Sequence, residues 1–177
     1  MVDDHERRIL VMGVSGSGKT TVGQALADRF GVPMIEGDDF HSEANKEKMH
    51  AGIALTDEDR APWLADIHKR LVSEPAGWVL ACSALKAKYR ATLFEGIAGV
   101  ETVLLTGSAE VLSKRMESRH GHFMPAELLQ SQFDTLEPPT NAVVVDVSGT
   151  VEETEQKVVE GLAGNREQGT VRCSSTR

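Results

Sequence analysis

Short apolar runs alternate along this chain with segments in which apolar residues recur every three or four positions. The runs are too short for helices and are typical of strands buried on both faces of a sheet. They cover residues 8–12, 32–36, 78–82, 100–105 and 143–146. The alternation predicts an α/β fold, with a five-stranded parallel sheet and helices on both of its faces.

The segments between these runs have the 3.6-residue periodicity of helices. We expect helices after residue 18, over 42–51, after 56, over 108–119, over 125–135 and after 150. Thr56 with Asp59, and Thr150 with Glu153, have the spacing of capping boxes, which mark helix starts. Pro62 is expected in the first turn of its helix, because proline disrupts a helix interior.

The first apolar run leads directly into a glycine-rich loop and then into a helix. Residues 13–20 fit the phosphate-binding pattern G-x-x-x-x-G-K-[ST]. Glycines let the backbone turn tightly around a polyphosphate, whose charge the free N–H groups of the next helix face. Lys19 is expected to reach the β- and γ-phosphates, and the Thr20 hydroxyl to hold Mg²⁺. The predicted nucleotide contacts are Gly13, Val14, Ser15, Gly16, Ser17, Gly18, Lys19, Thr20 and Thr21.

Composition narrows the class of protein. The chain has 177 residues, a formal net charge of −8 and a pI near 5.2. These values fit a single domain and argue against a protein that binds nucleic acid or a membrane surface. We expect one domain over residues 1–164 and a disordered tail over 165–177, where small polar residues accumulate.

The cysteines and the chain start bear on the compartment. Cys82 lies in an apolar run and Cys173 in a polar segment, so we expect no disulfide between them. No apolar run approaches the length of a transmembrane helix, and no signal-peptide pattern is present. The expected location is the cytoplasm.

A carboxylate and an imidazole follow the second predicted strand. Ligands of open parallel sheets bind beyond the carboxyl ends of the strands, so Asp38 and His41 are candidate substrate-binding residues. The alternative is that Asp38 or Asp39 caps the next helix.

Arg60 lies at the start of a predicted helix, where a cation is electrostatically unfavourable. This position indicates an anionic partner for Arg60. The partner is either a ligand or, in a surface salt bridge, Asp57 or Asp59.

More cations follow the third predicted strand. Ser83 comes directly after it, and Lys86 and Arg90 then share one helical face, suited to a phosphate or a carboxylate. For Lys88, exposure to solvent is an equally good interpretation.

Arg115 and Arg119 also share one helical face, shortly before Gly121. Paired arginines beside a glycine hinge favour a small lid, over about residues 115–125, that closes on phosphates. The alternative is an exposed basic helix end that matches the dipole of its own helix.

Together these motifs resemble the gluconokinase family, of the thermoresistant type within the nucleoside-monophosphate-kinase-like P-loop group. The resemblance spans about residues 8–160 and rests on residues 12–20, 37–41, 55–60, 82–86, 89–90, 119–123 and 131–138. The glycine loop alone indicates only an NTPase, whereas the C-S-A-L-K-x-x-Y-R stretch is much more specific. Ser42 and Ala54 stand where the family usually has proline, a departure that affects loop stiffness rather than chemistry.

The resemblance implies a P-loop kinase fold, ATP and Mg²⁺ as cofactors, D-gluconate as substrate, and a homodimer. It implies transfer of the γ-phosphate to the 6-hydroxyl of gluconate. On this interpretation Asp38 accepts the hydroxyl proton, and Arg60 pairs with the gluconate carboxylate. The catalytic residues are Lys19, Asp38, Arg115 and Arg119, and the substrate-binding residues are Asp38, His41, Arg60, Ser83, Lys86 and Arg90.

Other activities remain open at this point. A shikimate-type kinase is the nearest alternative, because its acceptor is also a hydroxy acid, and a nucleoside-monophosphate kinase is more distant. A GTP-hydrolysing switch is more distant again. Asp146 and Gly149 match D-x-x-G too late in the chain, and Lys48 replaces the aspartate of N-K-x-D.

Overall fold

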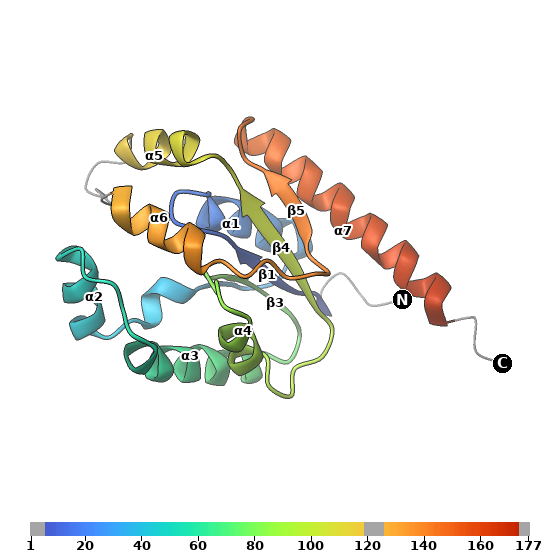
Figure 1. Ribbon diagram of the computed structural model, residues 1–177. Coiled ribbons are helices and arrows are strands. Elements are labelled where there is room, and N and C mark those ends of the chain that lie inside the picture. Colours follow the sequence, from blue (N-terminus) through green and yellow to red (C-terminus); the bar gives the residue numbers. More distant parts are fainter. Residues whose placement is uncertain (1–5, 119–125, 174–177) are drawn as a thin grey trace.

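The computed structural model describes residues 6–118 and 126–173, with side chains described for residues 6–118 and 127–165. Five parallel strands form one sheet in the order β2-β3-β1-β4-β5 (Figure 1). The strands are β1 Arg8–Met12, β2 Met34–Glu36, β3 Trp78–Ala81, β4 Val100–Thr106 and β5 Val143–Asp146. The predicted strands are therefore confirmed, with ends that differ by at most two residues.

The helices are placed by the side chains that they bury on the sheet. They are α1 Lys19–Phe30, α2 Glu43–His50, α3 Asp57–Val72, α4 Ala87–Leu93, α5 Ala109–Glu117, α6 Ala126–Thr135 and α7 Val151–Cys173. A 3₁₀ helix, Gly37–Phe40, follows β2.

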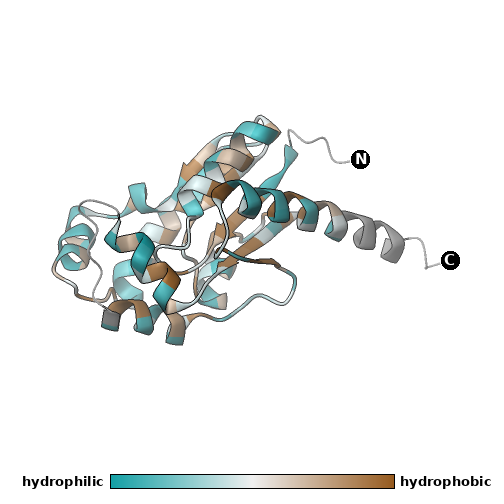
Figure 2. Ribbon diagram, turned by 90° about the horizontal axis from the view of Figure 1, so that it is seen from above, coloured by the Kyte–Doolittle hydropathy of each residue, from teal (hydrophilic) through white to brown (hydrophobic). Residues whose placement is uncertain are grey.

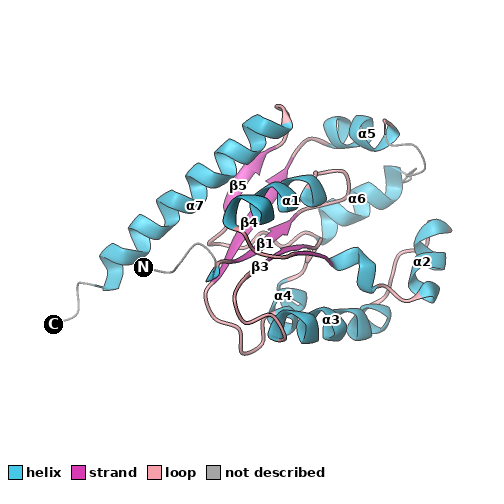
Figure 3. Cartoon of the chain, turned by 180° about the vertical axis from the view of Figure 1, so that it is seen from behind, coloured by secondary structure: helices cyan, strands magenta, loops and turns pink. Residues whose placement is uncertain are grey.

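Two apolar layers lie on opposite faces of the sheet, because successive side chains of β1 point to opposite sides. Ile9 and Val11 pack with the buried residues of α1, α5, α6 and α7. Leu10 and Met12 pack with those of α3 and α4. Figures 1 and 3 show these two groups of helices on either side of the strands. In Figure 2 the brown, hydrophobic colour follows the central strands, and the helices carry both colours.

The strand order fixes where a ligand can bind. After β1 the chain builds β2 and β3 on one side, and it later crosses to the other side for β4 and β5. The crevice at such a switch point opens beyond the carboxyl end of β1. That is where the glycine loop lies.

The predicted helix features agree with the structure except for the position of Pro62 and the end of α7. Both capping boxes are present, at Thr56 with Asp59 and at Thr150 with Glu153. Pro62, however, lies in the second turn of α3, so its predicted place in the first turn is wrong. The capping box fixes the helix start at residue 57, and the helix accepts a proline five residues later.

The polar C-terminal segment also differs from the prediction. Helix α7 continues to Cys173, although we expected a disordered tail from residue 165, and residues 174–177 lie outside the described residues. Residues 165–168 are Asn-Arg-Glu-Gln, three of which favour helix, and no proline interrupts the segment. Cys82 is buried as a free thiol. Among the described helices, none has the length and apolar character needed to cross a bilayer.

Candidate active site

The loop between β1 and α1 has the geometry that its glycines predict. Gly16 and Gly18 have φ angles of 80° and 90°, a region that favours glycine. At Gly13 a Cβ atom would lie 2.6 Å from the carbonyl oxygen of Leu105. Helix α1 begins at Lys19, as predicted, and carries no acidic residue in its first turn. Its free N–H groups and its dipole therefore favour an anion at the loop.

The loop closes on itself through Val14. The carbonyl oxygen of Val14 accepts the Ser17 N–H at 3.3 Å and the Lys19 ammonium at 3.2 Å. Gly16 packs closely against α5. A Cβ atom added at Gly16 would lie 2.9 Å from the side chain of Met116. Lys19 is thus held at the loop where it is predicted to bind the phosphates.

Glu36, the last residue of β2, belongs to the same site and was not among the sequence candidates. The Thr20 hydroxyl donates to Glu36 Oε2 at 2.7 Å. Burial raises the pKa of Glu36, and the neighbouring Asp38 raises it further, whereas the bond from Thr20 lowers it. The position of Glu36 at the carboxyl end of a strand, which selected Asp38, is the signal that could have found it.

Thr20 and Glu36 offer the oxygen atoms that Mg²⁺ prefers. Within the described part of the chain, no group of three or more His, Cys, Asp or Glu side chains forms a metal cage. Mg²⁺ commonly binds through one or two protein groups and completes its shell with water and phosphate. The two oxygens therefore fit a magnesium ion carried in with a nucleotide.

The 3₁₀ helix after β2 presents Asp38 and His41 differently. The Asp38 side chain is 75% exposed, and its Oδ1 lies 4.0 Å from His41 Nε2. His41 is buried and stacks on Trp63 with ring centroids 4.4 Å apart. The Trp63 indole N–H donates to the Gly37 carbonyl at 2.7 Å, which fixes the stack. Burial lowers the pKa of His41, so its ring is neutral at neutral pH.

The capping alternative for Asp38 and Asp39 is wrong. Ser42 caps α2 by accepting the Asn45 N–H at 3.2 Å, and Glu36 caps the 3₁₀ helix. Asp38 therefore remains available to a ligand.

Arg60 lies near the start of α3 with its guanidinium 5.4 Å from the centre of the Tyr89 ring. One of its nitrogens donates to the carbonyl of Leu55. The two acids considered as salt-bridge partners bind lysines instead, Asp57 with Lys88 and Asp59 with Lys48. Among the described side chains, those of residues 6–118 and 127–165, Arg60 has no ion-pair partner, so its charge is available for an anionic ligand.

Asp57 contacts Tyr89 and the two lysines that lie near the Tyr89 ring. Bonds from Lys88 and then from Tyr89 lower the pKa of Asp57 to about 2. The Tyr89 hydroxyl donates to Asp57 Oδ1 at 2.5 Å, and the Lys86 ammonium lies 3.7 Å away. Lys86 and Arg60 both lie over the Tyr89 ring, which brings these two predicted substrate contacts together.

Arg90 binds backbone carbonyl groups of the segment after β3. It donates to Ala84 at 2.8 Å, to Leu85 at 3.2 Å and to Glu137 at 2.8 Å. Burial lowers its pKa. These bonds position the turn that carries Ser83 and Lys86, and the predicted contact between Arg90 and substrate stays a prediction.

Arg115, on α5, points to the glycine loop and to the loop after β5. It donates to the carbonyl of Gly149 at 3.1 Å and to that of Val147. One of its nitrogens lies 3.8 Å from the Cβ position of Gly18. Arg119 and most of the predicted lid, residues 119–125, lie outside the described residues.

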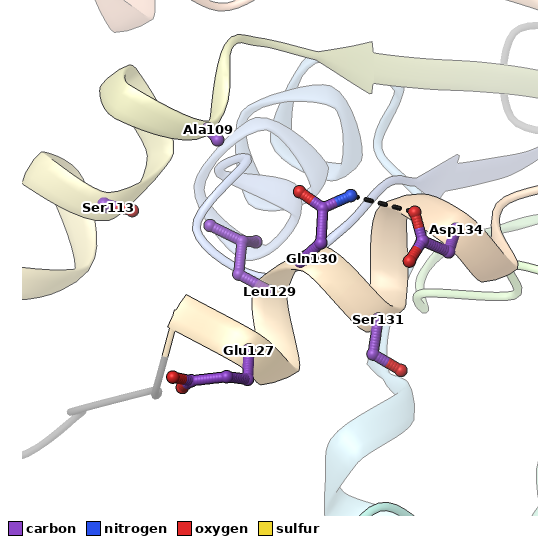
Figure 4. Close-up of a pocket in the computed structure, with 7 residues that line it drawn as sticks. All are labelled: Ala109, Ser113, Glu127, Leu129, Gln130, Ser131 and Asp134. Carbon is purple, nitrogen blue, oxygen red and sulfur yellow. Dashed lines mark hydrogen bonds between the residues drawn. The ribbon is translucent and has the colours of Figure 1, made fainter.

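A pocket of about 540 Å³ opens between α5 and α6 (Figure 4). Its lining includes Glu127, Gln130 and Asp134, and no predicted site residue. Two carboxylates are unfavourable for a polyphosphate. The glycine loop and the strand ends beside it therefore form the better candidate site.

The fold and the glycine loop define the class of P-loop nucleotide-binding proteins. The chain matches the AAA domain family over residues 9–139. It is 50% identical to the gluconokinase of Gluconobacter oxydans strain 621H over 81% of this chain and 83% of that protein. A gluconokinase crystal structure from Sinorhizobium meliloti 1021 superposes with a TM-score of 0.85, 46% identity and coverage of 97% of this chain and 99% of that chain. The chain belongs to the gluconokinase family.

A more distant structure shares the fold alone. Shikimate kinase from Bacteroides thetaiotaomicron superposes with a TM-score of 0.64 at 20% identity, over 89% of this chain and 98% of that chain.

Proposed function

We propose that this protein transfers the γ-phosphate of ATP to the 6-hydroxyl of D-gluconate and releases 6-phospho-D-gluconate and ADP. The proposal rests on family membership and on one arrangement at the site. Asp38 is exposed two residues after Glu36, which binds Thr20 of the glycine loop, and both Asp38 and Arg60 lie close enough to His41 to affect its pKa. On this proposal the Asp38 carboxylate takes the proton and the Arg60 guanidinium binds the carboxylate of one and the same acceptor.

In the proposed reaction, the acceptor oxygen attacks the γ-phosphorus as its proton passes to Asp38. The bond from that phosphorus to the β,γ-bridging oxygen breaks, and the electron pair leaves with ADP. Such transfer depends on alignment and charge neutralisation more than on covalent chemistry. Lys19, Arg115 and Arg119 would supply positive charge, and Mg²⁺ held near Thr20 and Glu36 would neutralise the phosphate oxygens.

Arg60 would bind the carboxylate of gluconate in a two-bond fork that lysine cannot form. His41 and Lys86 would contact the sugar-acid chain, and Ser83 would contact the substrate or the water shell of the metal. We further propose that the enzyme works as a homodimer in the cytoplasm. The dimer rests on the resemblance to the family, and the compartment on the two cysteines, whose positions suit a reducing environment.

Steady-state kinetics on an acceptor panel test the substrate. With ATP and Mg²⁺ in a coupled ADP assay, gluconate should be consumed, and shikimate and AMP should not. Turnover of shikimate in preference to gluconate would instead identify a shikimate-type kinase.

Two substitutions test the assigned roles. Asp38→Asn should lower kcat by about 10²–10⁴-fold, the usual contribution of a general base, whereas the adjacent exposed Asp39→Asn should leave it unchanged. Arg60→Lys should raise KM for gluconate at least about tenfold, as expected for loss of a charge-assisted bond. The matched change Arg70→Lys, on the same helix, should not. Near-normal turnover in Asp38→Asn would exclude it as the base.

A further inference from the structure

Gln132, on α6, binds the glycine loop from a distance of 117 residues along the chain. Its Oε1 accepts the Ser15 N–H at 2.7 Å, and its Nε2 donates to the Ser15 hydroxyl at 3.0 Å. One side chain therefore holds one loop residue at both its backbone and its side chain.

The chemistry of the pair explains why an amide suits this position. A backbone N–H can only donate, so it must meet the amide oxygen, and the amide nitrogen then faces the serine hydroxyl as a donor. Aspartate or glutamate could accept the N–H bond, but either would add negative charge beside a polyphosphate site. Among uncharged side chains, glutamine combines an acceptor and a donor with the required reach.

Ser15 occupies the sharpest part of the loop. Ser17 donates its N–H to the Val14 carbonyl at 3.3 Å, so Ser15 and Gly16 form the centre of a turn. The φ angle of 80° at Gly16 is the value expected for the third residue of a type II turn. The outer side of such a turn has no internal partner for the N–H of its second residue, and Gln132 provides one.

The loop is therefore held from two sides. Helix α5 packs against Gly16 through Met116 and the Leu112 carbonyl. Helix α6 holds Ser15 through Gln132. With the turn fixed, the N–H groups at the start of α1 are directed at the phosphates before a nucleotide arrives, which lowers the ordering cost of binding.

We infer that Gln132 is a positioning residue of the nucleotide site, which sets the shape of the glycine loop and thereby the affinity for nucleotide phosphates. The inference rests on the proposed nucleotide site and is independent of the acceptor. It concerns the binding of ATP and ADP, which can be measured without gluconate.

The first test is Gln132→Met, which keeps the length of the side chain and removes both bonds. Calorimetric titration should show ATP and ADP, with Mg²⁺, binding about tenfold more weakly, as expected for two lost hydrogen bonds. KM for ATP should rise by a similar factor, and KM for gluconate should not change. The matched control is Gln130→Met, on the same helix, whose side chain bonds to Asp134 and not to the loop.

The second test is Gln132→Glu, which keeps an acceptor for the Ser15 N–H and adds a negative charge. Its melting temperature without nucleotide should stay near that of the unmodified protein. Its affinity should fall further for ATP than for ADP, because repulsion grows with the number of phosphate charges. A merely structural role would not produce this dependence on phosphate number.

The outcomes separate the inference from the proposed function. Equal or tighter nucleotide binding in Gln132→Met would overturn the positioning role, as would equal losses for ATP and ADP in Gln132→Glu. Failure of the unmodified protein to bind ATP would instead overturn the nucleotide site itself. If Gln132→Met does not fold, Gln132→Asn, which keeps the amide but shortens its reach by one methylene group, takes its place in the same titrations.

Discussion

At the scale of single residues, Glu36 offers the sharpest prediction about the metal. It receives the hydroxyl of Thr20 at 2.7 Å and lies at the carboxyl end of β2. Glu36→Gln keeps a hydrogen-bond acceptor for Thr20 and removes the negative charge. We expect the Mg²⁺ concentration for half-maximal activity to rise about tenfold or more, since a charged ligand shell binds Mg²⁺ better than a neutral one.

The effect of Glu36→Gln on Mg²⁺ binding can also be measured without the enzymatic reaction. Titration of ADP at several Mg²⁺ concentrations should show that Mg²⁺ strengthens ADP binding less in Glu36→Gln than in the unmodified protein. Glu43→Gln, an exposed carboxylate in the first turn of α2, is the matched control and should change neither quantity. An unchanged Mg²⁺ requirement in Glu36→Gln would assign the carboxylate a purely local role toward Thr20.

The candidate site was predictable from sequence where its residues are contiguous or follow a strand. The glycine loop has its own pattern, and the strand-end rule selected Asp38 and His41. Glu36, which binds Thr20, was missed although the same strand-end rule could have selected it. Gln132 was missed because its partner lies 117 residues away, and nothing in the local sequence records a contact that arises only when α6 packs beside the loop.

At the scale of elements, a polar clamp joins α2 to α3. Lys48 donates to both oxygens of Asp59, at 2.7 and 2.8 Å, and Asn45 donates to the Asp59 carbonyl at 2.9 Å. Helix α2 follows the segment that carries Asp38, and α3 carries Arg60. The clamp therefore sets the spacing between the two groups that we expect to bind the acceptor.

Lys48→Met tests this role of the clamp. KM for gluconate should rise several-fold and KM for ATP should stay constant, because the glycine loop is not part of the clamp. The free energy of unfolding should fall only slightly, because an ion pair near the surface is screened by solvent. Lys46→Met removes an exposed pair with Glu43 from the same helix and should leave both Michaelis constants unchanged. A rise in KM for ATP would contradict the separation of the two subsites.

The elements themselves were largely predictable, because periodicity and caps are local properties. Five buried strands and two capping boxes were correctly placed. Pro62 was not, since tertiary packing of Trp63 and Leu64 on the sheet holds α3 together across the missing hydrogen bond. The end of α7 was missed because Gly164 and Gly169 disfavour a helix in the local sequence. The helix nevertheless continues through both glycines.

At the scale of the whole molecule, the glycine loop contacts elements that lie far apart along the chain. Residues of β4, α5 and α6 contact it directly, and it joins β1 to α1. A nucleotide bound there should therefore stabilise the entire fold. Cys82 can report this, because it follows β3 on the opposite face, donates its N–H to the Val11 carbonyl at 3.1 Å and is 1% exposed.

Burial raises the pKa of the Cys82 thiol to about 12, so the native thiol is both inaccessible and protonated. Thiolate is the reactive form, and labelling must therefore await an opening of the fold. In a Cys173→Ser background, Mg²⁺ and ATP at a hundred times the dissociation constant should slow labelling about a hundredfold, since such binding adds about 2.7 kcal/mol. In Lys19→Ala, whose nucleotide affinity should be much weaker, the same ATP concentration should give little protection. Labelling that ATP does not slow would mean that β3 opens while the loop stays folded, and the sheet would then not respond to the nucleotide as one unit.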